Sequence, residues 1–287
     1  MGGQYLNNLK FKLTTRDNIK LQAEFTKDET QPVKGVVIII HGFGEHIRGY
    51  RDLASFLAKS GYANFVFDQR GHGDLREYGK LEKMQGIIPS YQAFLDDIEL
   101  MTEQADNMVP GVPISLYGHS MGGNIILSYL IRLGWEDYKC VILESPWFGL
   151  FKELHPVVNR IAKILGFLSP KIAIYNELPP DKITGKADNK EDYDDDPFYH
   201  NRISLRMYAG VKNGCEYILK NASKVSIPIY LAYGKHDQIV CNNAIMQFTN
   251  KNDSNVKAKE YDAYHAIRKG SKRDEFFHDV VTYLDEQ

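Results

Sequence analysis

The chain has 287 residues, and 35 Lys and Arg against 37 Asp and Glu give it a formal charge of −2. Hydrophobic residues make up 43% and charged residues 25%, which are values typical of globular proteins. Disordered chains combine low hydrophobicity with high net charge, and nucleic-acid-binding proteins usually carry a strong positive excess. The composition therefore excludes a disordered chain and argues against a nucleic-acid partner.

Three cysteines, Cys140, Cys215 and Cys241, lie far apart in the sequence. An odd number without metal-ligand spacing predicts neither a disulfide framework nor a zinc site, and it fits a reducing compartment. The N-terminus has no basic stretch followed by an apolar one, so we expect no signal peptide. Apolar runs such as Val36–Ile40 are far too short to span a bilayer. We therefore expect a cytoplasmic protein with a single domain over residues 1–287.

Short apolar segments predict a series of strands. The first two, Lys10–Thr14 and Ile19–Thr26, alternate between apolar and polar residues, as an antiparallel pair with one solvated face does. Most later segments are almost wholly apolar, which is typical of strands buried on both faces. The later strands are expected at Val36–Ile40, Ala63–Phe67, Ile114–Tyr117, Cys140–Leu143, Ile229–Tyr233 and Val256–Tyr261.

Helical patterns lie between these strands. Phe94, Leu95, Ile98 and Met101 have the spacing of one helix face. Helices are expected at Tyr50–Ser60, Tyr91–Asn107, Met121–Leu133 and Ser271–Leu284. Because strands and helices alternate, we predict an α/β fold in which a mostly parallel sheet carries helices on both faces.

The alternation fails between Ser145 and Lys224, where the sequence carries no strand signal. Helices are expected at His155–Leu168 and Ile203–Leu219, separated by a polar loop over Asn176–Asp196. A segment of this size has too small a core to fold alone. We therefore predict an insertion over about residues 146–224 at the edge of the sheet.

The segment Gly118–Gly122 has the pattern G-x-S-x-G, directly after a predicted strand and directly before a predicted helix. In such an elbow the sharp turn exposes the serine hydroxyl, and the glycines avoid clashes that side chains would cause. The start of the following helix also directs free backbone N–H groups toward the same point. This context predicts that Ser120 is a nucleophile.

A serine hydroxyl is a weak nucleophile and needs a base. In folds with this elbow, an acid and then a histidine follow the serine, each at the carboxyl end of a strand. Asp237 follows the predicted strand Ile229–Tyr233, and His265 follows Val256–Tyr261. We therefore predict His265 as the base and Asp237 as the group that fixes its tautomer.

Neighbouring residues are weaker candidates for these two roles. His236 precedes Asp237 and so breaks the expected order of acid and histidine. Asp253 lies in a polar stretch that is typical of a solvated turn. Asp262 comes directly after the last predicted strand, and we interpret it as a strand-end residue.

The oxyanion of a tetrahedral intermediate needs preorganised donors. One is expected to be the backbone N–H of Met121, directly after the serine, and the other should come from the loop that follows Val36–Ile40. That loop, His41–His46, contains two glycines that let the backbone approach a substrate closely. The N–H of Phe43 is the candidate.

Four histidines in the first half of the chain have no recognised metal-ligand spacing. They are His41, His46, His72 and His119. The glycines of segment 42–49 match neither of the common phosphate-binding patterns. We therefore expect no metal and no cofactor, and we expect His119 to pack inside the elbow.

Together these motifs resemble α/β-hydrolases of the monoacylglycerol lipase and lysophospholipase group, which is related to the serine aminopeptidase S33 family. The loop His41–His46 and the turn Phe67–Gly73 are more specific than the widely shared elbow, and the similarity covers nearly the whole chain. The resemblance implies an eight-stranded sheet with a helical cap over the active site. It also implies a triad of Ser120, Asp237 and His265, with Phe43 and Met121 as oxyanion donors.

The first predicted cap helix is more apolar than one buried face requires. Its apolar residues are Val157, Val158, Ile161, Ile164, Leu165, Phe167 and Leu168. Such a helix packs on the core, lines a tunnel for an acyl chain or touches lipid. Because the acidic run Glu191–Asp196 would repel anionic lipid, we expect at most a weak peripheral membrane contact.

These observations predict a serine ester hydrolase that cleaves a lipid monoester, with monoacylglycerol as the leading substrate. A lysophospholipid, a short-chain or aryl ester, or a peptide with a free N-terminus would need the same chemistry. A different class is also open, namely a protein that binds a small ligand on a hydrolase scaffold without catalysis. The complete triad argues against that class, because a binding protein has no need of it.

Overall fold

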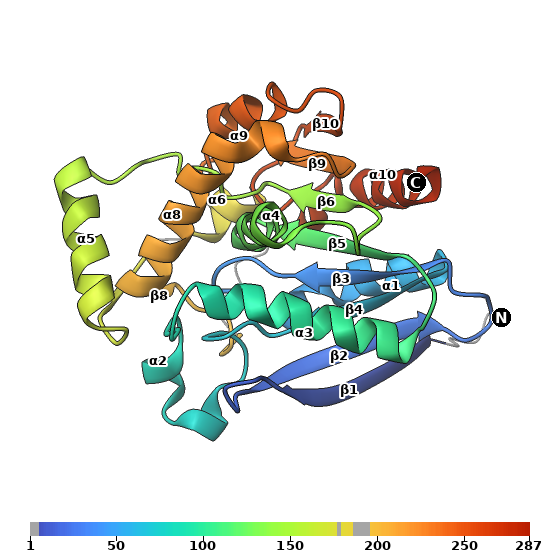
Figure 1. Cartoon of the computed structure of the whole chain (residues 1–287), viewed down its shortest axis with the longest axis horizontal. Helices are drawn as coiled ribbons and strands as arrows, with labels where there is room; N and C mark the ends of the chain where they lie inside the picture. Colours follow the sequence, from blue (N-terminus) through green and yellow to red (C-terminus); the bar gives the residue numbers. More distant parts are fainter. Residues whose placement is uncertain (1–5, 177–178, 186–195) are drawn as a thin grey trace.

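The computed structural model describes residues 6–176, 179–185 and 196–287, and its centre is one eight-stranded sheet (Figure 1). In spatial order the strands are β1 (Leu6–Thr14), β2 (Lys20–Asp28), β4 (Tyr62–Phe67), β3 (Gly35–Ile40), β5 (Ile114–His119), β6 (Val141–Glu144), β9 (Ile229–Gly234) and β10 (Val256–Tyr261). Strand β2 is antiparallel to both β1 and β4, and the remaining neighbours are parallel. The predicted mostly parallel α/β sheet is confirmed.

The sheet separates two apolar cores. Successive side chains of β3 point to opposite faces, so that Val36, Ile38 and Ile40 join one core and Val37 and Ile39 join the other. Every residue of β3 is buried, which explains its unbroken apolar sequence. The expectation of a strand buried on both faces is confirmed.

Helices cover both faces of the sheet (Figure 1). The first core includes residues of α3 (Gln92–Met108), α4 (Met121–Leu133) and α8 (Leu205–Asn221). The second includes residues of α1 (Arg51–Lys59) and α10 (Arg273–Glu286). Further helical segments are η1 (Ile47–Tyr50), η2 (Arg76–Tyr78), α2 (Leu81–Met84), η4 (Ala222–Lys224), α9 (Asn242–Thr249) and η5 (Ile267–Lys269). No helix in the described part of the chain is long and apolar enough to cross a membrane.

Between β6 and β9 the chain departs from the sheet. Helix α5 (Pro156–Leu168) packs on α8, and the short helix α6 (Pro180–Thr184) lies within the expected polar loop. The expectation that this segment has no strands is wrong, because β7 (Ala173–Tyr175) pairs antiparallel with β8 (Arg202–Ser204). Each strand has three residues, too few for a periodic pattern to emerge in the sequence. Most of the acidic run Glu191–Asp196 lies outside the described residues.

The start of α8 also differs from the expected helix. The sequence pattern places it at Ile203, whereas the helix begins at Leu205. The preceding residue, Ser204, has an extended backbone, and its hydroxyl accepts a hydrogen bond from the N–H of Met207 at 3.2 Å. A serine cap of this kind fixes the first turn of a helix. Apolar spacing alone cannot locate it.

Asp68, directly after β4, fastens the loop that follows β3. Its Oδ1 accepts a hydrogen bond from the N–H of Ile47 at 2.8 Å. Burial raises the pKa of Asp68 to about 7, although the Ile47 N–H opposes the rise. The unfolded chain releases this proton near pH 4 and the folded chain near pH 7, so the fold loses stability as the pH rises through this range.

The substitution Asp68→Asn should remove this pH dependence, since Asn keeps an acceptor for Ile47 and stays neutral. Between pH 5 and pH 8, the free energy of unfolding of wild type should fall by about 2–3 kcal/mol more than that of the variant. Urea unfolding at the two pH values measures the difference. Asp253→Asn, in an exposed turn, is the matched control. If wild type and Asp68→Asn differed by the same free energy of unfolding at both pH values, the raised pKa of Asp68 would be refuted.

Candidate functional site

Ser120 lies in the sharp turn between β5 and α4 and has a φ of 50° and a ψ of −113°. Non-glycine residues rarely adopt positive φ, and such strain persists only where surrounding contacts enforce it. Here the Ser120 N–H donates to the carbonyl of Glu144 at 2.9 Å, and its carbonyl accepts from the N–H of Trp147 at 2.9 Å. At Gly122 a Cβ atom would clash with the carbonyl oxygen of Ile40. The elbow therefore requires glycine where the sequence has it.

Asp237 and His265 meet beyond the carboxyl ends of β9 and β10. His265 Nδ1 lies 2.7 Å from Asp237 Oδ2. The other carboxylate oxygen accepts the N–H groups of Ile239 at 2.8 Å and Val240 at 3.0 Å. With its other oxygen engaged by backbone N–H groups, Asp237 is placed to accept a hydrogen bond from Nδ1–H, which leaves Nε2 of His265 as the free nitrogen.

Ser120, His265 and Phe43 line one narrow pocket with about 30 Å³ of open space. All three residues are buried. Among the described residues, no hydrogen bond joins the Ser120 hydroxyl to the His265 ring, whose Nδ1 is engaged by Asp237. Such bonds are often long in a free enzyme and tighten when substrate binds. The structure thus brings the predicted nucleophile, base and oxyanion loop together.

The predicted oxyanion donors are two backbone N–H groups. Met121 is the first residue of α4, where backbone N–H groups have no partner inside the helix. Phe43 lies in the loop after β3. Among the described residues, no hydrogen bond uses the N–H of either residue. Both groups are therefore available to an anion.

The weaker candidates lie apart from this pocket. His236 Nε2 lies 2.7 Å from Asp262 Oδ1, and both side chains are exposed. Asp253 is also exposed. In the portion of the chain that the structure describes, no group of three His, Cys, Asp or Glu side chains could hold a metal ion.

A buried charge network, which the sequence did not reveal, borders the pocket. Glu45 Oε2 accepts hydrogen bonds from the Gly42 N–H at 2.9 Å and from the Tyr50 hydroxyl at 2.5 Å, and it lies 2.9 Å from His119 Nδ1. Its Oε1 pairs with the guanidinium of Arg268. Burial opposes ionisation, but Arg268 and His119 outweigh it and hold the pKa of Glu45 well below its ordinary value. Glu45 is therefore an anion, and its oxygens can only accept hydrogen bonds from their neighbours.

Arg268 extends the network to Glu144, the last residue of β6. Its guanidinium lies 3.0 Å from Glu144 Oε2, and its backbone N–H donates to Glu144 Oε1 at 2.9 Å. The hydroxyl of Tyr117 also donates to Glu144. One signal in the sequence could have pointed to Arg268. It follows the predicted base, His265, by only three residues and so lies on the same segment.

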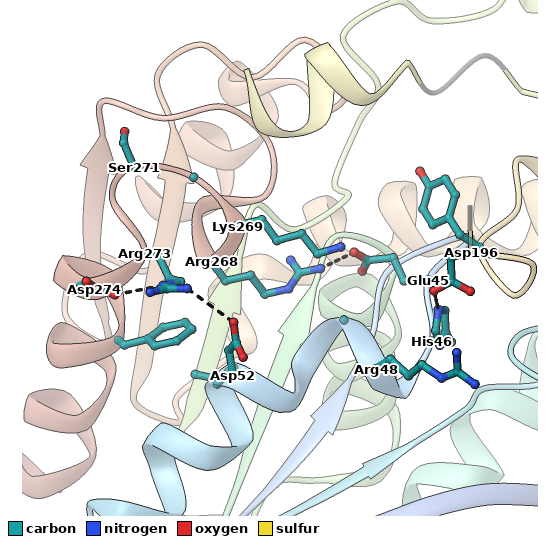
Figure 2. A pocket seen from close by; sticks show the side chains of 15 residues that line it. Glu45, His46, Arg48, Asp52, Asp196, Arg268, Lys269, Ser271, Arg273 and Asp274 are labelled. Atoms are coloured by element: carbon teal, nitrogen blue, oxygen red, sulfur yellow. Dashed lines mark hydrogen bonds and ion pairs between the residues drawn. The ribbon is translucent and has the colours of Figure 1, made fainter. Parts of the chain in front are cut away.

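A larger cavity of about 500 Å³ lies on the other side of Glu45 and shares that residue and Tyr199 with the pocket. Figure 2 shows that charged side chains of both signs surround it. Their ion pairs join Arg268 to Glu45 and Arg273 to Asp52 and Asp274, and a hydrogen bond joins His46 to Asp196. Neither Ser120 nor His265 lines this cavity. The smaller pocket is therefore the candidate active site.

Comparison with known proteins agrees with this geometry. A model of the family described as "Serine aminopeptidase, S33" matches residues 31–269. An uncharacterised abhydrolase domain-containing protein of Dictyostelium discoideum is 29% identical over 279 residues, which is 96% of this chain and 29% of that protein's length. The monoglyceride lipase of Saccharomyces cerevisiae is 31% identical over 227 residues, which is 73% of this chain and 70% of that protein.

The crystal structure of a soluble variant of the Saccharomyces cerevisiae lipase in complex with a substrate analog has the same fold. The two structures align with a TM-score of 0.81 at 26% identity, over 93% of this chain and 92% of that chain. The family model covers most of the chain. The chain therefore belongs to the serine aminopeptidase S33 family and has the α/β-hydrolase fold of its esterase and lipase relatives.

Proposed function

We propose that this protein is a serine ester hydrolase that cleaves monoacylglycerol to glycerol and a fatty acid. The observation that carries the proposal is the pocket that Ser120, Phe43 and His265 line together, in which His265 is hydrogen-bonded to Asp237. Relatives named as monoglyceride lipases support the choice of substrate. Lysophospholipids and small esters are the alternative substrates for the same chemistry.

In the proposed reaction His265 Nε2 takes the proton of Ser120 while Oγ attacks the ester carbonyl. Asp237 holds the imidazolium that forms. The N–H groups of Phe43 and Met121 stabilise the oxyanion. The alcohol leaves with the proton from His265, and water then releases the fatty acid from the acyl-enzyme.

The pocket lining suits an ester with one apolar and one polar part. Its apolar residues are Phe43, Trp147, Leu150, Ile183 and Ile239. Its polar residues, apart from Ser120 and His265, are Glu45, His119, Asn176 and Tyr199. The first set is chemically complementary to an acyl chain and the second to an alcohol with free hydroxyls.

An aminopeptidase would need a carboxylate free to bind the ammonium of its substrate. Among the described lining residues, the carboxylate is that of Glu45. It already accepts from Gly42 and Tyr50 and pairs with Arg268. This arrangement favours an ester over a peptide with a free N-terminus.

Ser120→Ala and His265→Ala should each lower kcat by about 10⁴-fold or more on p-nitrophenyl octanoate and 1-monooleoylglycerol, because each removes a reacting group. Ser254→Ala and His236→Ala, both at exposed positions, should retain wild-type rates. A fluorophosphonate probe should label wild type and not Ser120→Ala. Wild-type activity confined to C2–C4 esters would refute monoacylglycerol as the substrate. Absence of both turnover and labelling would favour a binding protein instead.

We also propose that the predicted cap, residues 146–224, touches lipid through α5. The buried residues of α5 are Ala162 and Gly166, and a Cβ at Gly166 would clash with the backbone of Leu205 at the start of α8. The large apolar side chains face outward instead, with Phe167 83% and Leu168 70% exposed. Exposed apolar side chains gathered on one helix mark a surface that binds an apolar partner.

Phe167→Asp and Leu168→Asp should each weaken binding to phosphatidylcholine vesicles by about tenfold or more, since each removes an apolar side chain worth about 1.5–3 kcal/mol when buried. Co-sedimentation with vesicles measures the effect, and hydrolysis of p-nitrophenyl acetate checks that the site is intact. Asn107→Asp, which adds the same charge at an exposed position of α3, is the control. Equal vesicle binding by all four proteins would contradict the lipid contact.

A further inference from the structure

A second cavity, of about 300 Å³, lies apart from the pocket of Ser120, and no residue lines both. Its apolar lining comes from β2, from the segment between β4 and α3, and from the predicted cap. Six of the lining residues are Leu21, Leu75, Met84, Ile87, Ile88 and Pro170. Leu21 and Ile88 also belong to the first apolar core, so the cavity reaches into the interior of the protein.

The size and lining of this cavity suit a small amphipathic molecule. The pocket of Ser120 has about 30 Å³ of open space, whereas this cavity has about 300 Å³. Sites for small molecules commonly start near that size, and a few polar groups among apolar side chains orient the ligand. Water in an apolar cavity finds few hydrogen-bond partners, so its replacement by a hydrocarbon chain is favourable.

Most charged side chains that line the cavity already have partners. The buried Arg70 holds two carboxylates, those of Asp17 at 2.6 Å and Asp97 at 2.7 Å. The buried carboxyl of Asp68 accepts a hydrogen bond from the N–H of Ile47. Two further ion pairs neutralise charges at more exposed positions, and they are Lys20 with Glu77 and Asp74 with Arg76.

Lys171 offers a positive charge at the edge of the cavity. It lies in the predicted cap, directly after Pro170, and it lines the cavity while remaining exposed. In the part of the chain that the structure describes, no carboxylate forms an ion pair with its ammonium group. A lysine stem can cover apolar surface while its charged end stays in water. An anion at the mouth of the cavity would therefore meet this charge.

We propose that this cavity binds the anion of a fatty acid, with the hydrocarbon chain among the apolar side chains and the carboxylate paired with Lys171. A ligand with one apolar chain and one negative charge matches both the lining and the charge of Lys171. The choice of a fatty acid rests on the proposed function, because that reaction releases one. The cavity itself is separate from the catalytic pocket, so the proposal adds a binding site for the product to the site of reaction.

The cavity and the catalytic pocket are neighbours. His72 lines the first and Phe43 lines the second, and the centroids of their rings lie 6.0 Å apart. Both side chains are buried. A substitution at His72 would disturb the loop of Phe43, so a test of the cavity needs positions away from this contact. Ile87 is half-buried and Lys171 is exposed, and neither lines the catalytic pocket.

Isothermal titration calorimetry with dodecanoate, below its micelle concentration, tests the site. The protein is first reacted with an alkyl fluorophosphonate, which occupies the pocket of Ser120. We expect one dodecanoate to bind per chain. Butyrate, which has the charge without the long chain, should bind at least about 100-fold more weakly. Dodecyltrimethylammonium, which has the chain with the opposite charge, should bind at least about fivefold more weakly.

Two variants locate the bound dodecanoate. Ile87→Trp should weaken binding about tenfold or more, because the larger side chain takes up space in the cavity. Lys171→Glu should weaken it about three- to tenfold, because it replaces an exposed ion pair with a repulsion. Leu133→Trp and Lys224→Glu make the same changes at exposed positions outside the cavity and should bind as wild type does. If Ile87→Trp fails to fold, the exposed Lys171→Glu carries the test.

The outcomes separate this proposal from that of the hydrolase. Absence of dodecanoate binding to the labelled wild type, or equal binding by wild type, Ile87→Trp and Lys171→Glu, would overturn the fatty-acid site. Equal binding of dodecanoate and dodecyltrimethylammonium would overturn it as well. Binding that follows the expected pattern in a protein that hydrolyses no ester would support the site and refute the hydrolase. If the probe does not react with Ser120, the same variants test the cavity without it.

Discussion

A single buried ion cluster holds the candidate site together. Arg268 lies between Glu45, in the loop after β3, and Glu144, at the end of β6. Leaving a buried charge without its partner costs about 3–5 kcal/mol, so each of these loops is fastened by the others. The cluster is adjacent to three features that the proposed chemistry needs: the loop of Phe43, the turn of Ser120 and the segment that carries His265.

The same cluster also connects two parts of the pocket through Glu45. Glu45 accepts a hydrogen bond from the N–H of Gly42, whereas the N–H of the next residue, Phe43, has no hydrogen-bond partner among the described residues. Glu45 Oε2 also lies 2.9 Å from Nδ1 of His119, the residue directly before Ser120. One carboxylate is thus connected to the loop of Phe43 on one side and to the turn of Ser120 on the other.

Local signals account for what the sequence predicted well. Apolar runs located the central strands, and the G-x-S-x-G pattern with its flanking glycines located the turn of Ser120, because both depend on neighbouring residues. The pairing of Glu45 with Arg268 joins residues 223 positions apart and leaves no periodic trace. Two further features were not predicted for a related reason. The strands β7 and β8 have only three residues each, and the start of α8 depends on one serine side chain. The roles of Ser120, Asp237 and His265 remain predictions that the geometry supports.

A crystal structure of the protein after reaction with a phosphonate analogue of 1-monooctanoylglycerol tests the account most directly. We expect a bond from Ser120 Oγ to phosphorus, with the phosphoryl oxygen about 2.7–3.1 Å from the backbone nitrogens of Phe43 and Met121. An adduct on another residue, or a phosphoryl oxygen that points away from both N–H groups, would contradict the proposed mechanism.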